Sequence, residues 1–164
     1  MNAISDALCD LPLASASTQA ETFTLRRTGR RPTRFDGWLL VEASSAPDAG
    51  GVQYDVRLYR STRGRIVAEL VAHRGEPDAP DLEHVETLAS LEEAADWLLR
   101  HRCASDLSLP AALNHEDTPL LQAALLAVRV RQQTARLQDE YNALLSDVFT
   151  ALGIAEPLEA ADAA

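Results

Sequence analysis

The sequence predicts an α+β protein, with a four- or five-stranded antiparallel sheet, one packed helix and a long C-terminal helix. The first half contains runs rich in β-branched and aromatic residues, separated by clusters of Gly, Pro and Asp, which is the pattern of strands and turns. The second half contains one short and one long stretch with helical spacing of apolar residues. At 164 residues, 46% of them hydrophobic, the chain can bury one core.

Five runs are predicted to form the sheet: 21–28, 34–45, 52–61, 65–74 and the shorter 83–88. The clearest pair is the hairpin of 52–61 and 65–74, whose first strand alternates apolar and polar side chains as a half-buried strand does. Its apolar face carries Val52, Tyr54, Val56 and Leu58. The other face also contains large apolar residues, so we expect it to be covered or to bind a partner.

The segment 90–101 is predicted to form the packed helix. Ser90 and Glu93 have the spacing of a capping box, and Leu91, Ala94, Ala95 and Leu98 fall on one helical side. We therefore expect this helix to pack on the sheet.

The long helix is predicted over 119–152, with Thr118 as its N-cap, Pro119 in its first turn and Gly153 at its C-cap. A helix of these 34 residues is about 51 Å long, whereas a small domain is only roughly 30 Å across. An unbroken helix of this length must therefore extend beyond its own domain.

Along this helix, apolar residues step by three and four in an unbroken heptad pattern, which predicts pairing with a partner helix. We expect a homodimer whose interface lies along the middle of the helix: Val130, Thr134, Leu137, Tyr141, Leu144 and Val148. The alternative is a break near Gln132, which would give a hairpin of two core helices.

These elements divide the chain into four predicted parts. Residues 1–20 form a flexible N-terminal tail, 21–105 the sheet-and-helix domain, 117–153 the oligomerisation helix, and 154–164 an acidic disordered tail.

Charge is unevenly distributed along a chain whose formal net charge is −10. Residues 22–74 contain ten Arg and five acids, whereas 75–164 contain five Arg and 17 acids. We expect the basic side chains to gather on one rim of the sheet as a binding surface: Arg26, Arg27, Arg30, Arg31, Arg34, Arg57, Arg60, Arg63 and Arg65.

Two uses of these arginines remain open, since they either neutralise the acidic half of the chain or bind an external anionic partner. For an external partner, a protein is favoured over nucleic acid. Few aromatic residues accompany the basic loop, and the net charge opposes a long polyanion.

A search for chemistry predicts no catalytic residue, no metal site and no cofactor. The chain has no Gly-rich phosphate loop, no HExxH and no GxSxG motif. Cys9 and Cys103 are far apart, and His101 with Cys103 is too few ligands for zinc. We expect His101 to complement the negative end of a helix dipole.

No run of 18 apolar residues and no signal-peptide pattern is present, so we expect a cytoplasmic protein without a membrane span.

The segments GRRPTRFDGWLLVEASS, VRLYRSTRGRIVAELVAHR and HVETLASLEEAADWLL resemble the sheet region of uncharacterised bacterial proteins often found on mobile elements, including the EXLDI family. The resemblance covers about half of the chain. It implies a bacterial setting and association with a plasmid or phage, and it implies no activity.

Together these observations predict a non-enzymatic interaction or regulatory protein that acts as a homo-oligomer and binds its partner through the Arg-rich sheet edge. Two alternatives remain: an inhibitor whose acidic half mimics nucleic acid, and an enzyme whose site has no sequence signature. The mimic requires acids spaced along one face, and few acids occur between Pro119 and Leu152.

Overall fold

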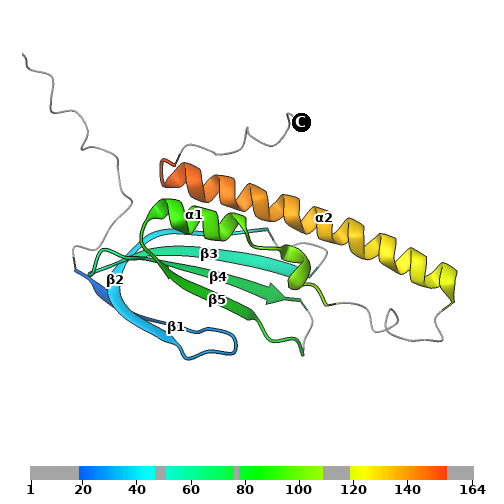
Figure 1. Ribbon diagram of the computed structural model, residues 1–164, viewed down its shortest axis with the longest axis horizontal. Helices are drawn as coiled ribbons and strands as arrows, with labels where there is room; N and C mark the ends of the chain where they lie inside the picture. Colours follow the sequence, from blue (N-terminus) through cyan, green and yellow to red (C-terminus); the bar gives the residue numbers. More distant parts are fainter. Residues whose placement is uncertain (1–18, 47–50, 76–77, 109–118, 155–164) are drawn as a thin grey trace, which may run out of the picture.

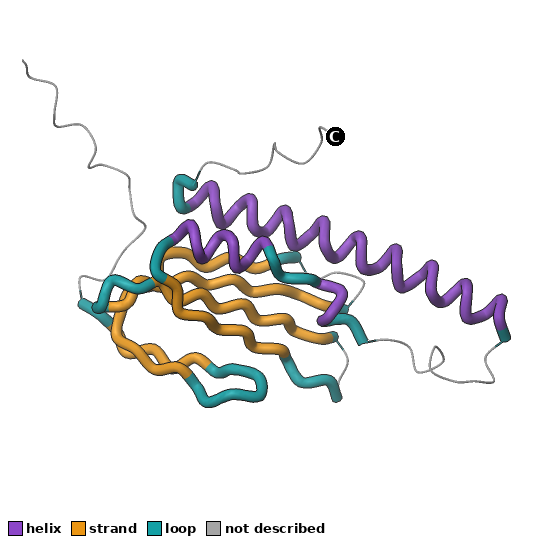
Figure 2. The backbone as a smooth tube through the Cα atoms, in the orientation of Figure 1, coloured by secondary structure: helices purple, strands orange, loops and turns teal. Residues whose placement is uncertain are grey.

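A computed structural model describes residues 19–46, 51–75, 78–108 and 119–154. It confirms the α+β class and the five predicted strands, which form one antiparallel sheet in the order β1-β2-β3-β4-β5 (Figures 1 and 2). The elements are β1 (Glu21–Leu25), β2 (Thr33–Ser44), β3 (Val52–Ser61), β4 (Ile66–Arg74), β5 (Leu82–Leu88), α1 (Leu91–Leu99), the short 3₁₀ helix η1 (Cys103–Ser105) and α2 (Leu120–Ala151).

Both helices cover the same face of the sheet (Figure 1). α1 lies against β4 and β5, while α2 lies against β2 and β3. The alternating side chains predicted for β3 point into this layer, where Tyr54, Val56 and Leu58 are almost fully buried. The main core therefore lies between the sheet and the two helices, as the strand pattern predicted.

The N-terminal part of β2 folds back over the opposite face of the sheet. The first residues of β2, Thr33 to Gly37, pair with β1 to form a hairpin, and the residues from Gly37 onward pair with β3 (Figure 2). Gly37 itself lies opposite Ser61 of β3. At this bend a Cβ on residue 37 would lie 2.2 Å from the carbonyl oxygen of Arg60. Gly37 is required there because the two strands approach too closely for a side chain.

A second, smaller core lies beneath this hairpin. It contains Leu25 of β1 together with Tyr59, Val67 and Val85 of the underlying strands, and the rings of Phe23 and Phe35 pack against it. The hairpin thus covers part of the second apolar face of the sheet, which was predicted from sequence to be covered or to bind a partner.

Hydrogen bonds fix the tip of the hairpin to the outer edge of β5. The backbone N–H of Thr28 donates to the carbonyl of Glu83 at 2.9 Å, and the N–H of Glu83 donates to the Thr28 hydroxyl at 2.7 Å. The sheet is therefore curled, and this contact joins its first hairpin to its last strand.

The predicted helix caps are largely confirmed. The hydroxyl of Ser90 accepts from the Glu93 N–H at 3.2 Å, while the Glu93 carboxylate accepts from the Ala89 N–H at 2.7 Å. α2 begins one residue later than predicted, with Pro119 at its N-cap. Gly153 has φ of 66° and follows the last turn, where the N–H of Ile154 reaches back to the Phe149 carbonyl at 3.0 Å.

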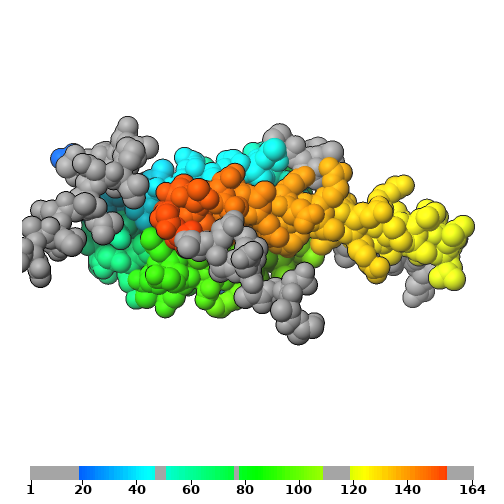
Figure 3. Space-filling model, turned by 90° about the horizontal axis from the view of Figure 1, so that it is seen from above, coloured from blue at the N-terminus to red at the C-terminus, as the bar shows by residue number. Residues whose placement is uncertain are grey.

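α2 is unbroken, so the predicted alternative of a helical hairpin near Gln132 is wrong. Its 32 residues give a length of about 48 Å at 1.5 Å per residue. Its C-terminal half packs on the sheet, and its N-terminal end extends past the body of the protein (Figure 3). Half of the predicted oligomerisation segment therefore belongs to the same core as the sheet. The predicted tails and Thr118 fall largely or wholly outside the described residues.

Candidate interaction surfaces and polar clusters

The N-terminal end of α2 exposes a group of large apolar side chains. Among the described residues, six large hydrophobic side chains are exposed, and four of them lie in the first nine residues of this helix. They are Leu120, Leu121, Leu125 and Val128, with exposed fractions of 87%, 73%, 61% and 50%. We call Leu121, Leu125 and Val128, which lie on one side at helical spacing, the apolar stripe.

The segment that carries the apolar stripe is apolar around most of its circumference. From Leu120 to Val128 the sequence LLQAALLAV contains one polar residue and no charge. A helix of this composition is ordinarily buried on all sides. In the single chain, however, the first buried side chain of α2 is Leu137.

The predicted oligomer interface is divided between two environments. Leu137, Tyr141, Leu144 and Val148 are buried within the chain's own core, against the sheet and α1. For these four residues the assignment to an oligomer interface needs correction, because their side chains are already covered by the same chain. Val130 and Thr134 are partly exposed and lie outside this core.

The predicted basic rim separates into distinct groups. Thr28 at the hairpin tip docks on Glu83 of β5, whose partner in β4 is Val71. The turn that carries Arg63 and Arg65 lies at the other end of β4, beside Ile66. Five residues of strand separate the two places, or about 17 Å at 3.3–3.4 Å per residue. The arginines near the hairpin tip therefore lie away from Arg63 and Arg65. The base of the hairpin lies beside that turn, because the N–H of Thr62 donates to the carbonyl of Asp36, two residues from Arg34, at 2.8 Å. The two groups are thus separated at the tip and adjacent at the base.

The remaining predicted arginines lie on the β1–β2 hairpin. Phe35 faces inward to Tyr59, so the neighbouring Arg34 of β2 points outward, whereas Arg26, Arg27, Arg30 and Arg31 lie in the connection of residues 26–32. Arg27 forms an ion pair with Glu86 at 3.7 Å. The others are exposed and have no ion pair within the described part of the chain; we call them the hairpin arginines: Arg26, Arg30, Arg31 and Arg34.

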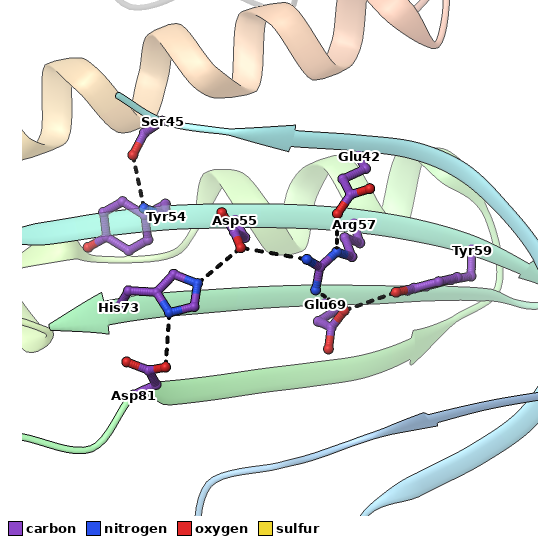
Figure 4. Close-up of polar contacts among 9 residues, drawn as sticks. All are labelled: Glu42, Ser45, Tyr54, Asp55, Arg57, Tyr59, Glu69, His73 and Asp81. Atoms are coloured by element: carbon purple, nitrogen blue, oxygen red, sulfur yellow. Dashed lines mark hydrogen bonds and ion pairs between the residues drawn. The ribbon is translucent and has the colours of Figure 1, made fainter. Parts of the chain in front are cut away.

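Arg57 lies elsewhere, in a charged ladder across three strands on the face away from the helices (Figure 4). It is directly opposite Glu42 in β2 and Glu69 in β4. Its Nε donates to Glu42 at 2.6 Å and its Nη1 to Glu69 at 3.4 Å. The hydrogen bond to Glu42 raises the pKa of Arg57 more than burial lowers it. Because its charge is neutralised inside the chain, Arg57 does not belong to a free basic surface.

Glu69 is the buried member of this ladder, with a second donor in Tyr59. The Tyr59 hydroxyl donates to the Glu69 carboxylate at 3.0 Å, which satisfies a charge that is only 6% exposed. Burial, together with this carboxylate, raises the pKa of Tyr59. The hydroxyl therefore remains protonated and acts as a donor.

His73 is held between two carboxylates at the end of β4 (Figure 4). Its Nδ1 lies 2.9 Å from Asp81 and its Nε2 lies 3.0 Å from Asp55. Burial alone would lower the pKa of His73, but the two carboxylates raise it. The two carboxylates thus favour the protonated imidazole, and with both nitrogens in hydrogen-bond contact His73 has no free nitrogen to act as a base.

A second polar cluster lies on the helix side of the sheet and is centred on Asp106. This carboxylate is 1% exposed. It accepts from the Tyr54 hydroxyl at 2.7 Å, and the Nε2 atom of His101 lies 2.6 Å away. Burial opposes its charge, yet these hydrogen bonds, with that from Ser105, hold the pKa of Asp106 below its usual value. The cluster ties the segment after α1 to the central strand β3.

The ring of Tyr141 and the thiol of Cys103 beside this cluster are buried, while the rings of His101 and His84 are partly buried. The rings of His101 and Tyr141 lie 5.5 Å apart, and those of His101 and His84 5.4 Å apart. Burial raises the pKa of the Cys103 thiol to about 11, so it is not a reactive thiolate. Burial, with the neighbouring His101, lowers the pKa of His84.

Sequence reasoning placed His101 at the helix end but missed its contact with Asp106. One signal was available: Tyr54 lies on the buried face of a strand, and a buried tyrosine hydroxyl requires a hydrogen-bond partner. Which residue supplies that partner depends on a contact between positions 52 residues apart.

Within the described residues, no group of three or more His, Cys, Asp or Glu side chains is placed to hold a metal ion. No helix in this part of the chain is long and apolar enough to span a membrane. Comparison with known proteins finds no matching family, no matching curated protein and no matching solved structure.

Proposed function

We propose that the protein is a non-enzymatic interaction protein that associates with itself through the N-terminal end of α2 and presents the hairpin arginines to a partner. The observation that carries the proposal is the exposure of Leu120, Leu121, Leu125 and Val128 on a helical end that has no charged residue. Contiguous apolar surface of this kind marks an interaction site in soluble proteins.

A second copy fits this surface because the apolar stripe is self-complementary. The three residues are separated by four and three positions, so the stripe has nearly the same spacing read in either direction. If two helices cross antiparallel about a two-fold axis near Leu125, Leu121 of one copy meets Val128 of the other. A closed dimer of this kind buries the stripes of both copies.

The expected strength follows from the side chains involved. Full burial of a Leu or Val contributes about 1.5–3 kcal/mol, and the three stripe residues are 73%, 61% and 50% exposed in the single chain, so each contributes about 1–2 kcal/mol. The six stripe side chains of a dimer then give roughly 6–12 kcal/mol before the association cost of about 4–15 kcal/mol. We expect a reversible dimer whose population depends on concentration in the micromolar range or above, rather than an obligate one.

The test compares two double variants by sedimentation velocity over a wide range of protein concentration. Leu121→Gln with Leu125→Gln removes half of the exposed apolar group and keeps helix propensity nearly unchanged. Leu39→Gln with Leu99→Gln is the matched control, because these two leucines are also exposed and lie outside α2. We expect wild type and control to dimerise and the α2 variant to stay monomeric. A wild type that stays monomeric at the highest concentration, or a control that dissociates equally, would refute the proposal.

A further inference from the structure

The β1–β2 hairpin is a fixed platform for the hairpin arginines. Its base is continuous with β2 at Gly37, its inner side packs on Tyr59, and its tip is bonded to Glu83 at two points. A partner that binds its outer surface therefore has little backbone ordering to impose.

The hairpin arginines form no ion pair with the described part of the chain. The strand pair itself contains two acids, Glu21 and Asp36, and Asp36 accepts a hydrogen bond from the Thr22 hydroxyl at 2.5 Å. Among the arginines of this hairpin, Arg27 forms an ion pair with Glu86. The outer surface thus carries a local positive charge on a protein whose net charge is −10.

The extent of the charged surface limits what can bind. Three of the four hairpin arginines lie in the seven-residue connection of residues 26–32, and Arg34 lies in β2 opposite Thr24. Arg60, Arg63 and Arg65 lie beyond the base of the hairpin, where Thr62 is bonded to Asp36, and not at its tip. An extended polypeptide with an acid at every second residue places carboxylates about 6.8 Å apart, so a short segment supplies enough of them for these four arginines.

The part of the hairpin next to the arginines, residues 21–37, offers no outward stacking surface for bases. Its two aromatic residues, Phe23 and Phe35, face inward, with ring centroids 4.7 Å and 5.5 Å from that of Tyr59. The partly exposed Trp38 follows Gly37 and lies opposite Arg60, beyond the base of the hairpin. Binding of single strands relies on exposed aromatic rings, and binding of duplexes relies on cations distributed along a groove. Neither feature accompanies these four arginines.

We infer that the hairpin arginines bind a short acidic segment of a protein partner, in which Arg guanidinium groups pair with closely spaced carboxylates. The inference rests on the proposed function and specifies the chemistry of the partner. Guanidinium groups suit carboxylate pairs, and a short segment avoids the repulsion that a long polyanion meets from the acidic remainder of the protein.

The experiment measures fluorescence anisotropy with a labelled peptide of about four Glu-Ala repeats, which spans roughly 27 Å when extended. The same peptide with Gln in place of Glu is the probe control. The test variant is Arg30→Gln, Arg31→Gln and Arg34→Gln; the matched protein control is Arg60→Gln, Arg63→Gln and Arg65→Gln, which removes equal charge beyond the base of the hairpin and leaves its tip unchanged.

At low salt we expect wild type and the matched control to bind the Glu peptide, and the hairpin variant to bind at least about tenfold more weakly, since each exposed charge pair contributes up to about fivefold. The Gln peptide should not bind to any of them. Equal loss in the matched control, or no binding of the Glu peptide by wild type, would overturn the inference.

Labelled single-stranded and duplex DNA provide the competing class of partner. If either binds wild type more tightly than the Glu peptide and loses affinity in the hairpin variant, the partner class is nucleic acid and the inference is wrong. Sedimentation of the hairpin variant separates the two proposals, because its oligomeric state should equal that of wild type. If wild type dimerises but does not bind the peptide, only the inference of an acidic partner is refuted. If wild type is monomeric and binds the peptide, only the proposed self-association is refuted.

Discussion

Replacing His101 with alanine should destabilise the fold by about 1–3 kcal/mol. Its imidazole is one of three side chains within hydrogen-bond distance of the Asp106 carboxylate among the described residues, and that carboxylate is 1% exposed. Removing a hydrogen-bond partner of a buried charged group costs more than the roughly 1–3 kcal/mol of a neutral group. His101 itself is 14% exposed, so water can reach part of the vacated space and the expected loss is smaller. The Tyr54 and Ser105 donors remain.

His73→Ala is the control variant, because His73 also contacts a carboxylate but is more exposed than His101. His73 also lies within 3.0 Å of a carboxylate, but its side chain is 39% exposed. An exposed pair of this kind contributes only about 0–1 kcal/mol. Urea unfolding at neutral pH and fixed protein concentration measures both variants against wild type. If His101→Ala costs no more than His73→Ala, the Asp106 cluster does not hold the segment after α1 to the sheet.

Unfolding measurements at acid pH test whether the stability loss of His101→Ala comes from the charge of Asp106. The pKa of Asp106 is lowered in the fold, so its contribution is present above its unfolded pKa of about 3.9 and is lost as pH falls through the folded value. In His101→Ala, burial dominates and should raise the pKa of Asp106. The variant's deficit relative to wild type should therefore shrink as pH falls below about 4. A deficit independent of pH would assign the cost to lost ring packing instead.

Two further predictions concern the sheet. Leu58→Ala should cost about 2–5 kcal/mol in urea unfolding, because Leu58 is 1% exposed in the main core, and a loss below 1 kcal/mol would contradict its place there. The pKa of His73 is raised despite burial, so its contribution is present below about pH 6.5 and is lost as pH rises through the folded value. His73→Gln should therefore differ from wild type in acid and converge with it in alkali, and a gap that widens with pH would reverse the assignment.

The strands and helix ends were predictable because their signals are local. Alternation over 52–61 identifies a half-buried strand without reference to the rest of the chain, and Ser90 with Glu93 or Gly153 acts within one helical turn. The fold-back of β2 was not predictable. It depends on Gly37 passing close to the carbonyl of Arg60, and a glycine within a strand pattern indicates only that some backbone lies near.

The positions of the arginines were likewise not predictable, because they depend on which distant segments the fold brings together. Sequence spacing identified a group of basic residues but could not place its members relative to one another. The fold separates Arg57 into a ladder with Glu42 and Glu69, and it places Arg63 about 17 Å from the hairpin tip along β4. The hairpin arginines remain as a group because they are close in sequence and belong to one hairpin.

The long helix shows why a heptad pattern does not identify what covers it. Steps of three and four define one side of a helix, and a partner helix or a sheet of the same chain satisfies that side equally well. Composition along the helix distinguishes the two. The half with Tyr141 and Phe149 supplies large side chains that fill the space above a sheet, whereas Leu121 and Leu125 lie in an uncharged stretch that the chain leaves exposed. A helix whose bulky half packs in its own core and whose apolar end stays outside favours a second surface that covers that end, and the self-association proposed above would provide it.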